Sequence, residues 1–300
     1  MASMLGDISI DVGDFSSRNG ARLSLSIDAR ARAGIVESEI NYYDTGSGAI
    51  REQAVLSWKV VSMTHTRRTG SLLTFALGED GQLVVIEKVK VWERPLTAMP
   101  GYEAGHGPLR KLRAFGDAVV AVGMDRRVYE FRPDETWFDR SAPATRAKPV
   151  TGFEAVTGSG LEDFYCAGWR GEIWHCAAGK WQQIDSPTNI MITDLTLAGD
   201  TVYGCGLAGL ILVGSGAQWR VLDQGAFDLD LYSICVYEGR IFAASLYGVY
   251  ELKQDKLHDV DYGIVPPTTA HTLCSTPEGL GVIGAKDLFF FDGATWRKLE

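Results

Sequence analysis

The sequence predicts an all-β chain built from repeated four-stranded units. Three markers recur in one phase, at steps of about 40 residues. They are a tryptophan that opens the last strand of a unit, a turn between the first two strands, and a small residue that closes the second strand. A period near 40 residues with four strands per unit is typical of propeller blades, so we expect a β-propeller of about seven blades.

The markers are clearest in the second half of the chain. The tryptophans are Trp137, Trp181, Trp219 and Trp296, and Gln254–Asp255–Lys256 keeps the turn where a fifth tryptophan is missing. The first turns are Gly116–Asp117, Glu162–Asp163, Gly199–Asp200, Glu238–Gly239 and Glu278–Gly279. The small residues are Gly123, Gly168, Gly206, Ser245 and Gly284. One small sheet cannot bury both of its faces, so stacking against neighbouring sheets gives the physical reason for the repetition.

The blade count depends on the N-terminal segment. Five blades are expected at 109–141, 153–187, 193–223, 232–260 and 271–300, and a sixth at 55–95. Residues 1–53 carry none of the markers and are expected to be irregular or a degenerate blade, although 7–12, 21–27 and 35–44 have strand character. The alternative is six recognisable blades over 54–300 with an N-terminal extension. We expect a single domain over 1–300. The last blade has all four strands in the C-terminal sequence, but the sequence leaves open whether the N-terminus adds a strand to close the ring.

Composition limits the compartment and the partners. The formal charge of −9 argues against a nucleic-acid surface and against anionic lipid, and it favours fast encounter with a basic protein. No apolar run is long enough to span a bilayer, and residues 1–7 lack a basic start and an apolar core, so we expect a cytoplasmic protein. The five cysteines all fall in expected strands and are interpreted as buried free thiols, with a Cys166–Cys176 disulfide as the alternative.

The motifs associated with enzymes, cofactors and metals are weak. Gly204–Gly209 matches G-x-G-x-x-G, but a third blade strand, and not a helix, is expected after it, so no dinucleotide site is predicted. The five histidines lack metal-ligand spacing, no G-x-S-x-G elbow occurs, and the aspartates have no calcium-loop spacing. We therefore expect no catalytic residue, cofactor or metal.

Gly293–Ala294–Thr295–Trp296 resembles the end of the Asp-box (S-x-D-x-G-x-T-W) of sialidase-like propellers. The serine and aspartate positions of that motif hold Phe289 and Phe291, so the resemblance implies a propeller turn and no catalytic residue. The period is also similar to that of WD40 repeats and of bacterial photosystem-assembly-factor propellers. No blade has the Gly-His and Trp-Asp pair, so the resemblance is to the β-propeller superfamily and not to one family.

Alternating strand direction places the turn between the second and third strands, and the link from one blade to the next, on one face. Large apolar or charged residues occupy several of these turn tips, where small polar residues are usual, and aromatic groups beside arginine are typical of binding hot spots. The alternative is that the apolar groups fold inward and cap the central channel. The predicted partner-binding residues in the turns are Asp125, Arg126, Trp169, Arg170, Leu207, Leu246, Tyr247 and Lys286. Those in the links are Asp228, Asp230, Asp259 and Asp261. The alternative interpretation is that these four carboxylates form a solvated acidic rim.

These features favour a non-enzymatic protein that binds another protein through one loop face. The sharper hypothesis is an immunity or inhibitor protein that neutralises a basic toxic partner by covering its active site. Two alternatives remain open. One is a glycosidase or lyase with a polar site at the channel mouth, and the other is an assembly scaffold that uses several faces. The sequence does not fix the oligomeric state.

Overall fold

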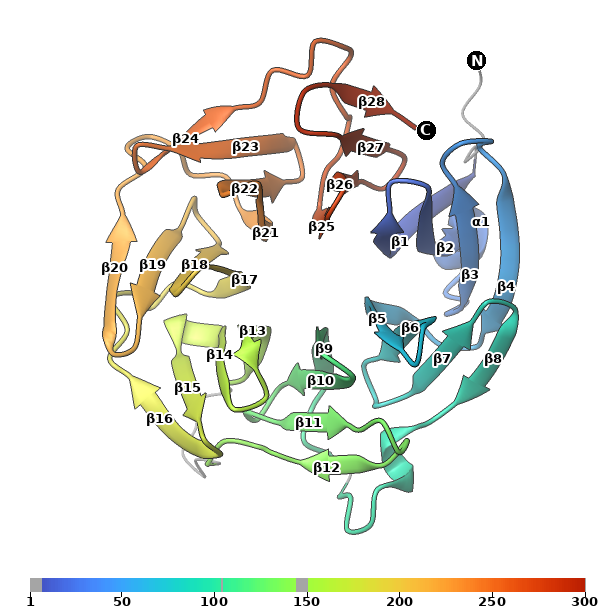
Figure 1. Ribbon diagram of the computed structural model, residues 1–300, viewed down its shortest axis with the longest axis horizontal. Coiled ribbons are helices and arrows are strands. Elements are labelled where there is room, and N and C mark those ends of the chain that lie inside the picture. Colours follow the sequence, from blue (N-terminus) through green and yellow to red (C-terminus); the bar gives the residue numbers. More distant parts are fainter. Residues whose placement is uncertain (1–6, 104, 144–150, 300) are drawn as a thin grey trace. The chain divides into compact units, whose positions relative to one another are not determined.

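The computed structural model describes residues 7–103, 105–143 and 151–299. In these residues the chain forms seven four-stranded antiparallel sheets, each from one continuous segment (Figure 1). This is the strand plan of a seven-bladed β-propeller. The predicted fold class is confirmed, and the alternative of six blades with an extension is excluded. The chain divides into two compact units, one of Met1–Val60 with Asp230–Glu300 and one of Val61–Leu229, called unit 1 and unit 2.

Unit 1 holds the first sheet and the last two sheets of the chain. The first sheet comprises β1 (Ile8–Ser17), β2 (Gly20–Ile27), β3 (Ser38–Asp44) and β4 (Ile50–Leu56), with the short helix α1 (Asp28–Arg32) after β2. The next comprises β21 (Leu231–Tyr237), β22 (Arg240–Ser245), β23 (Gly248–Lys253) and β24 (Lys256–Asp259). The last comprises β25 (Thr272–Thr276), β26 (Gly279–Ile283), β27 (Leu288–Phe291) and β28 (Trp296–Lys298).

Unit 2 holds the other four sheets. They are β5 (Val60–Arg68), β6 (Ser71–Gly78), β7 (Leu83–Glu87) and β8 (Lys90–Glu93); and β9 (Leu109–Phe115), β10 (Ala118–Gly123), β11 (Val128–Phe131) and β12 (Trp137–Asp139). Then come β13 (Phe153–Gly160), β14 (Asp163–Gly168), β15 (Ile173–Ala177) and β16 (Lys180–Ile184); and β17 (Ile192–Ala198), β18 (Thr201–Gly206), β19 (Ile211–Ser215) and β20 (Gln218–Leu222). Two 3₁₀ turns, η1 (Leu96–Ala98) and η2 (Trp169–Gly171), lie in the connections.

The N-terminal segment is a regular blade, which the markers did not reveal. The tryptophan position at the start of the last strand holds Ile50, which packs with a lower volume against the same kind of apolar cluster. The link after β2 carries α1, which interrupts the alternation expected for 35–44 and delays the third strand to Ser38. The first blade therefore has the same four-strand plan as the other blades but different side chains at the marker positions.

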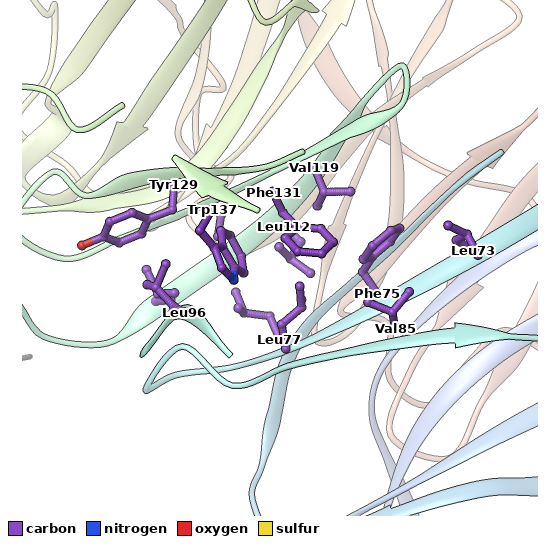
Figure 2. Close-up of a cluster of buried hydrophobic side chains, with 13 residues drawn as sticks. Leu73, Phe75, Leu77, Val85, Leu96, Leu112, Val119, Tyr129, Phe131 and Trp137 are labelled. Atoms are coloured by element: carbon purple, nitrogen blue, oxygen red, sulfur yellow. The ribbon is translucent and has the colours of Figure 1, made fainter. Parts of the chain in front are cut away.

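The cores lie between neighbouring sheets. Figure 2 shows one of them in unit 2, where Phe75 and Leu77 of β6 pack against Phe131 of β11 and Trp137 of β12. The Phe75 and Phe131 rings meet edge to face at 6.0 Å between centroids. Every residue of β10 is buried, because a middle strand of a blade has a neighbouring sheet on both faces.

The tryptophan marker has a structural reason in unit 2. The indole Nε1 of Trp137 donates to the carbonyl of Arg94, which follows the last strand of the preceding blade, at 2.9 Å. Trp181 repeats this contact with the carbonyl of Arg140 at 2.8 Å. Each tryptophan therefore ties its blade to the blade before it. Trp219 differs, because its indole donates to Gly216 within its own turn.

We expect Trp181→Phe to lower the free energy of unfolding by about 1 kcal/mol, since it removes one hydrogen bond and keeps most of the aromatic packing. Urea denaturation followed by circular dichroism measures the change. The exposed neighbour Lys180→Ala is the control and should leave the midpoint unchanged. An unchanged midpoint for Trp181→Phe would contradict the assignment of a stabilising role to the indole contact.

The small residue that closes the second strand also has a reason. A β-carbon on Gly284 would lie 1.9 Å from the carbonyl oxygen of Thr269, and one on Gly206 would lie 2.2 Å from that of Met191. The backbone of the link that enters the blade passes over the α-carbon at this point. Only a residue with little or no side chain fits beneath it.

Side-chain packing joins the first sheet to the last sheet within unit 1, and among the described residues no strand passes from one of these sheets to the other. Phe15 of β1 is fully buried against Phe290 of β27, with ring centroids 5.7 Å apart. Gly281 of β26 makes room for Phe15, because a β-carbon there would lie 2.2 Å from the Phe15 ring. The hydroxyl of Tyr43 donates to the carbonyl of Leu299, 256 residues away, at 2.8 Å. The last blade is built from β25 to β28 alone, which answers the question of ring closure that the sequence left open.

Candidate functional site

Backbone hydrogen bonds bring the predicted turns and links together in each unit. In unit 2 the amide of Gly209 donates to the carbonyl of Leu229 at 2.9 Å, and in unit 1 the amide of Ala270 donates to that of Leu246 at 3.3 Å. The turn between the second and third strands is thus packed against a link between blades. The predicted residues are divided between the units, so each group is described within its own unit.

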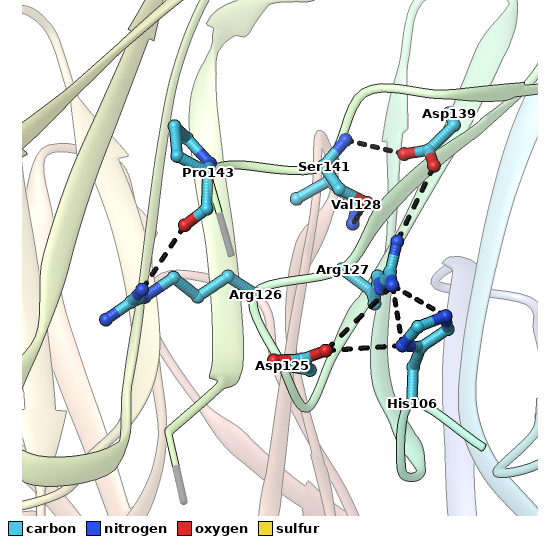
Figure 3. Close-up of polar contacts among 8 residues, drawn as sticks. All are labelled: His106, Asp125, Arg126, Arg127, Val128, Asp139, Ser141 and Pro143. Carbon is cyan, nitrogen blue, oxygen red and sulfur yellow. Dashed lines mark hydrogen bonds and ion pairs between the residues drawn. The ribbon is translucent and has the colours of Figure 1, made fainter. Parts of the chain in front are cut away.

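In unit 2 the turn Asp125–Arg127 has one buried and one exposed side. Figure 3 shows Arg127 beside His106 and Asp139, while Arg126 points the other way, towards Pro143. The Asp125 carboxylate lies 3.2 Å from Nδ1 of His106 and stays partly exposed. Asp125 therefore remains available on the surface of this turn.

Arg126, which was predicted to bind the partner, has a buried side chain in the structure. Its side chain is 6% exposed and pairs with Glu172, which is 7% exposed, with Nη2 and Oε2 at 2.7 Å. The guanidinium lies 5.1 Å from the Trp174 ring centroid and donates to the Pro143 carbonyl at 3.2 Å. Planar stacking and bidentate pairing suit a buried arginine, so it joins two neighbouring blades.

Trp169 is also tied into its blade. Its indole donates to the Glu154 carboxylate of β13 at 2.6 Å, and Arg110 of β9 lies 3.4 Å from the same oxygen. Burial raises the pKa of Glu154, and the Trp169 and Arg110 contacts oppose that rise. These contacts favour the inward-folded alternative at this position. Leu207 is half-buried, whereas Arg170, at a left-handed φ of 60°, and Asp228 are exposed.

Lys286 in unit 1 is likewise engaged within the chain. Its Nζ donates to the carbonyl of Ile8 at 2.6 Å and to the carboxylate of Asp28 at 2.8 Å. The Lys286 hydrogen bond holds the pKa of Asp28 below its usual range, and a second bond from Ser9 adds to the effect. Lys286 therefore links the last sheet to the first, which is a structural role the sequence did not suggest.

Unit 1 brings five predicted residues close together. Tyr247, at the tip of the turn after β22, is 73% exposed, and its neighbour Leu246 is 42% exposed. A groove of about 320 Å³ lies between Tyr247 and the link that carries Asp259 and Asp261. Both carboxylates are exposed. Asp230 also belongs to this region. Burial raises the pKa of Tyr232, and the nearby Asp230 carboxylate and Tyr247 hydroxyl add to that rise.

Two exposed apolar residues in this link were missed by the sequence reasoning. Ile264 is 43% exposed and Val265 is 77% exposed. They stand before Pro266–Pro267, in the connection between β24 and β25. The sequence did contain a signal for them. An apolar pair followed by two prolines in a connection between blades indicates exposed apolar side chains, because the prolines prevent this segment from joining a sheet.

A second groove of about 650 Å³ is also lined by residues of this link and contains the ion pair between Arg240 and Glu251. Glu251 accepts two hydrogen bonds from Arg240, at 2.7 and 2.8 Å, and lies 2.8 Å from Lys253. These bonds lower the pKa of Glu251 to about 2. Arg240 also lies over the Phe242 and Phe291 rings, at 4.9 and 5.3 Å from their centroids.

Glu251 gives a prediction for the dependence of stability on pH. A carboxyl group whose pKa falls from an ordinary 4.5 to about 2 on folding stabilises the fold above pH 4.5, and this contribution disappears as the pH falls towards 2. We expect Glu251→Gln to cost on the order of 1 kcal/mol at pH 7, after solvent screening at the partly exposed Arg240, and almost nothing at pH 2. Thermal unfolding of both proteins from pH 2 to 7 measures this. Parallel curves would contradict it.

No group of three or more histidine, cysteine or acidic side chains able to hold a metal occurs among the described residues. Within the described chain, no helix has the length and apolar character needed to cross a membrane. All five cysteines are buried and free, so the alternative Cys166–Cys176 disulfide is not formed. Residues 204–209 lie in β18 and the turn before β19, so a strand follows the glycines where a dinucleotide site requires a helix.

Comparisons with known proteins support the fold and point to a function class. No family model matches the chain. The immune protein Tsi7 of Pseudomonas aeruginosa PAO1 is 32% identical over 272 residues, which cover 89% of each chain. The WD40 β-propeller domain of Doa1 superposes with a TM-score of 0.68 at 14% identity, over 93% of this chain and 90% of that one. U3-55K gives 0.66 at 10% identity, over 94% and 93%. These two structures bear on the fold alone.

Proposed function

The chain belongs to the family of the immune protein Tsi7, and from this premise we propose that it is a non-enzymatic immunity protein that binds and neutralises a toxic protein. The observation that carries the proposal is the 32% identity over 89% of both chains. Similarity of that extent covers most of the chain and not one motif. It therefore supports a shared mode of action as well as a shared fold.

We propose that the partner is basic and that the chain covers its active site. The formal charge of −9 supports the first part, because opposite net charge speeds encounter and suppresses wrong partners. The grooves beside the link Asp259–Pro267 support binding at a loop face, since they combine exposed apolar side chains with carboxylates. Five buried free thiols support a reducing cytoplasm as the place of action.

Co-expression with the proteins encoded beside this chain tests the proposal. We expect one of them to stop growth when expressed alone, to become harmless when this chain is present, and to co-purify with it as a stoichiometric complex. A mixture of the purified proteins should then show loss of the toxic activity in step with complex formation. If no neighbour binds and none is neutralised, the proposal is wrong, and a small-molecule ligand should be sought instead.

A further inference from the structure

We infer that the groove between Tyr247 and the link Asp259–Pro267 of unit 1 receives a lysine- or arginine-bearing segment of the toxic partner, with Ile264 and Val265 covered in the complex. This inference rests on the proposed function and adds the binding surface and the chemistry of the segment that fits it. The surface, called the 247/264 groove below, is made by residues of unit 1 alone.

The walls of the 247/264 groove suit a cationic side chain. Three tyrosines, Tyr247, Tyr250 and Tyr262, line it together with Asp259 and Asp261. Tyrosine ring faces attract ammonium and guanidinium groups, and carboxylates beside them pair with the same charge. Among the described residues that line the groove, none is lysine or arginine. The charge of the groove is therefore negative and complementary to a basic segment.

The link is held rigidly at both ends. At its start the amide of Val260 donates to the carbonyl of Val249 at 3.2 Å, and the Tyr262 hydroxyl accepts from the Val249 amide at 3.1 Å. At its far end the buried Asp287 carboxylate accepts from the amides of Thr268 and Thr269, both at 3.0 Å. The Asp261 carboxylate also accepts from the Gly263 amide at 2.9 Å, which fixes the turn before Ile264.

This anchoring leaves the apolar pair in solvent. Ile264 and Val265 stand between the two anchors and, together with Tyr247, form an exposed apolar group next to the carboxylates. A loop fixed in advance loses little conformational entropy on binding, so its apolar contacts contribute more to affinity. An apolar centre within a polar rim is the usual anatomy of a protein interface, and tyrosine is common among its strongest contacts. Val89 is also exposed, but it stands alone between Lys88 and Lys90 and is not part of an apolar group.

The test uses the toxic partner identified by co-expression and the full-length chain. The first variant, Y247A/I264S/V265S, removes the apolar contacts and should weaken the complex by about 100-fold in Kd. The second, D259N/D261N, keeps the side-chain shapes and the acceptor for Gly263 but removes the charge. It should lower the association rate by about 10-fold at low salt and remove most of its salt dependence. The control V89S removes an apolar side chain that is 87% exposed and should bind like the wild type.

The outcomes separate the inference from the proposed function. If the wild type binds and protects while both variants, folded by circular dichroism, bind equally well, the 247/264 groove is not the docking surface and the proposed function stands. If the wild type neither binds nor protects, both fail. If Y247A/I264S/V265S does not fold, D261K replaces it, and undiminished affinity of D261K overturns the inference. A dimer of the wild type that Y247A/I264S/V265S dissociates would assign the groove to a second copy and also overturn it.

Discussion

Arg126→Met is expected to lower the free energy of unfolding by about 3–5 kcal/mol, because it leaves the Glu172 carboxylate buried without its cation. Glu172 would keep one donor, the Trp174 indole at 2.9 Å, but that contact cannot neutralise its charge. Chemical denaturation at pH 7 measures the loss. The double variant R126M/E172Q removes both charges and retains an acceptor for Trp174, so it should recover a large part of the stability.

The double variant distinguishes a buried charge from lost packing. If R126M and R126M/E172Q are equally unstable, the arginine acts through its stacking on Trp174 and not through the ion pair. If R126M unfolds within about 1 kcal/mol of the wild type, the pair is not the buried joint between blades that its low exposure indicates.

Phe15→Ala is expected to cost about 3–5 kcal/mol, because it empties a fully buried ring from the contact between the first and last sheets. The complementary change Gly281→Ala adds one carbon where the Phe15 ring already sits and should cost about 1–3 kcal/mol. Both are measured by thermal and urea unfolding.

Phe138→Ala is the matched control, because that ring is 43% exposed on β12, with the guanidinium groups of Arg132 and Arg140 at 4.1 and 5.6 Å from its centroid. It should cost about 1 kcal/mol or less. Equal losses for F15A and F138A would show that the contact between the first and last sheets adds nothing to stability beyond ordinary surface packing.

The repeated residues predicted the fold because each has a fixed structural task. Trp137 and Trp181 reach back to the preceding blade, and Gly206 and Gly284 lie beneath a passing backbone, so the positions recur wherever that geometry recurs. The first blade escaped detection because Ile50 fills the tryptophan position with a different side chain. A repeated sequence pattern therefore identifies a blade only when the same type of residue occupies the marker position.

The site was predicted less well, because a turn position does not determine where its side chain points. Arg126 and Trp169 occupy the expected turns, yet each finds a carboxylate inside the blade, Glu172 and Glu154. These partners lie 46 and 15 residues away in sequence, so no local spacing could indicate them. Tyr247 stays exposed, and its nearness to Asp259 depends on how the long link folds back over β23.

The contact between the first and last sheets also sets the order of events during synthesis. The Cys274 thiol donates to the carbonyl of Gly13, 261 residues earlier in the chain. At about 5–20 residues per second, the ribosome needs on the order of 10 to 50 s to make the residues between them. Throughout that interval Phe15 and Ile10 have no C-terminal sheet to cover them, so the nascent chain exposes an apolar face that chaperones can bind. Chains released before β26 would keep that face uncovered, and we expect them to be degraded faster than the full-length chain.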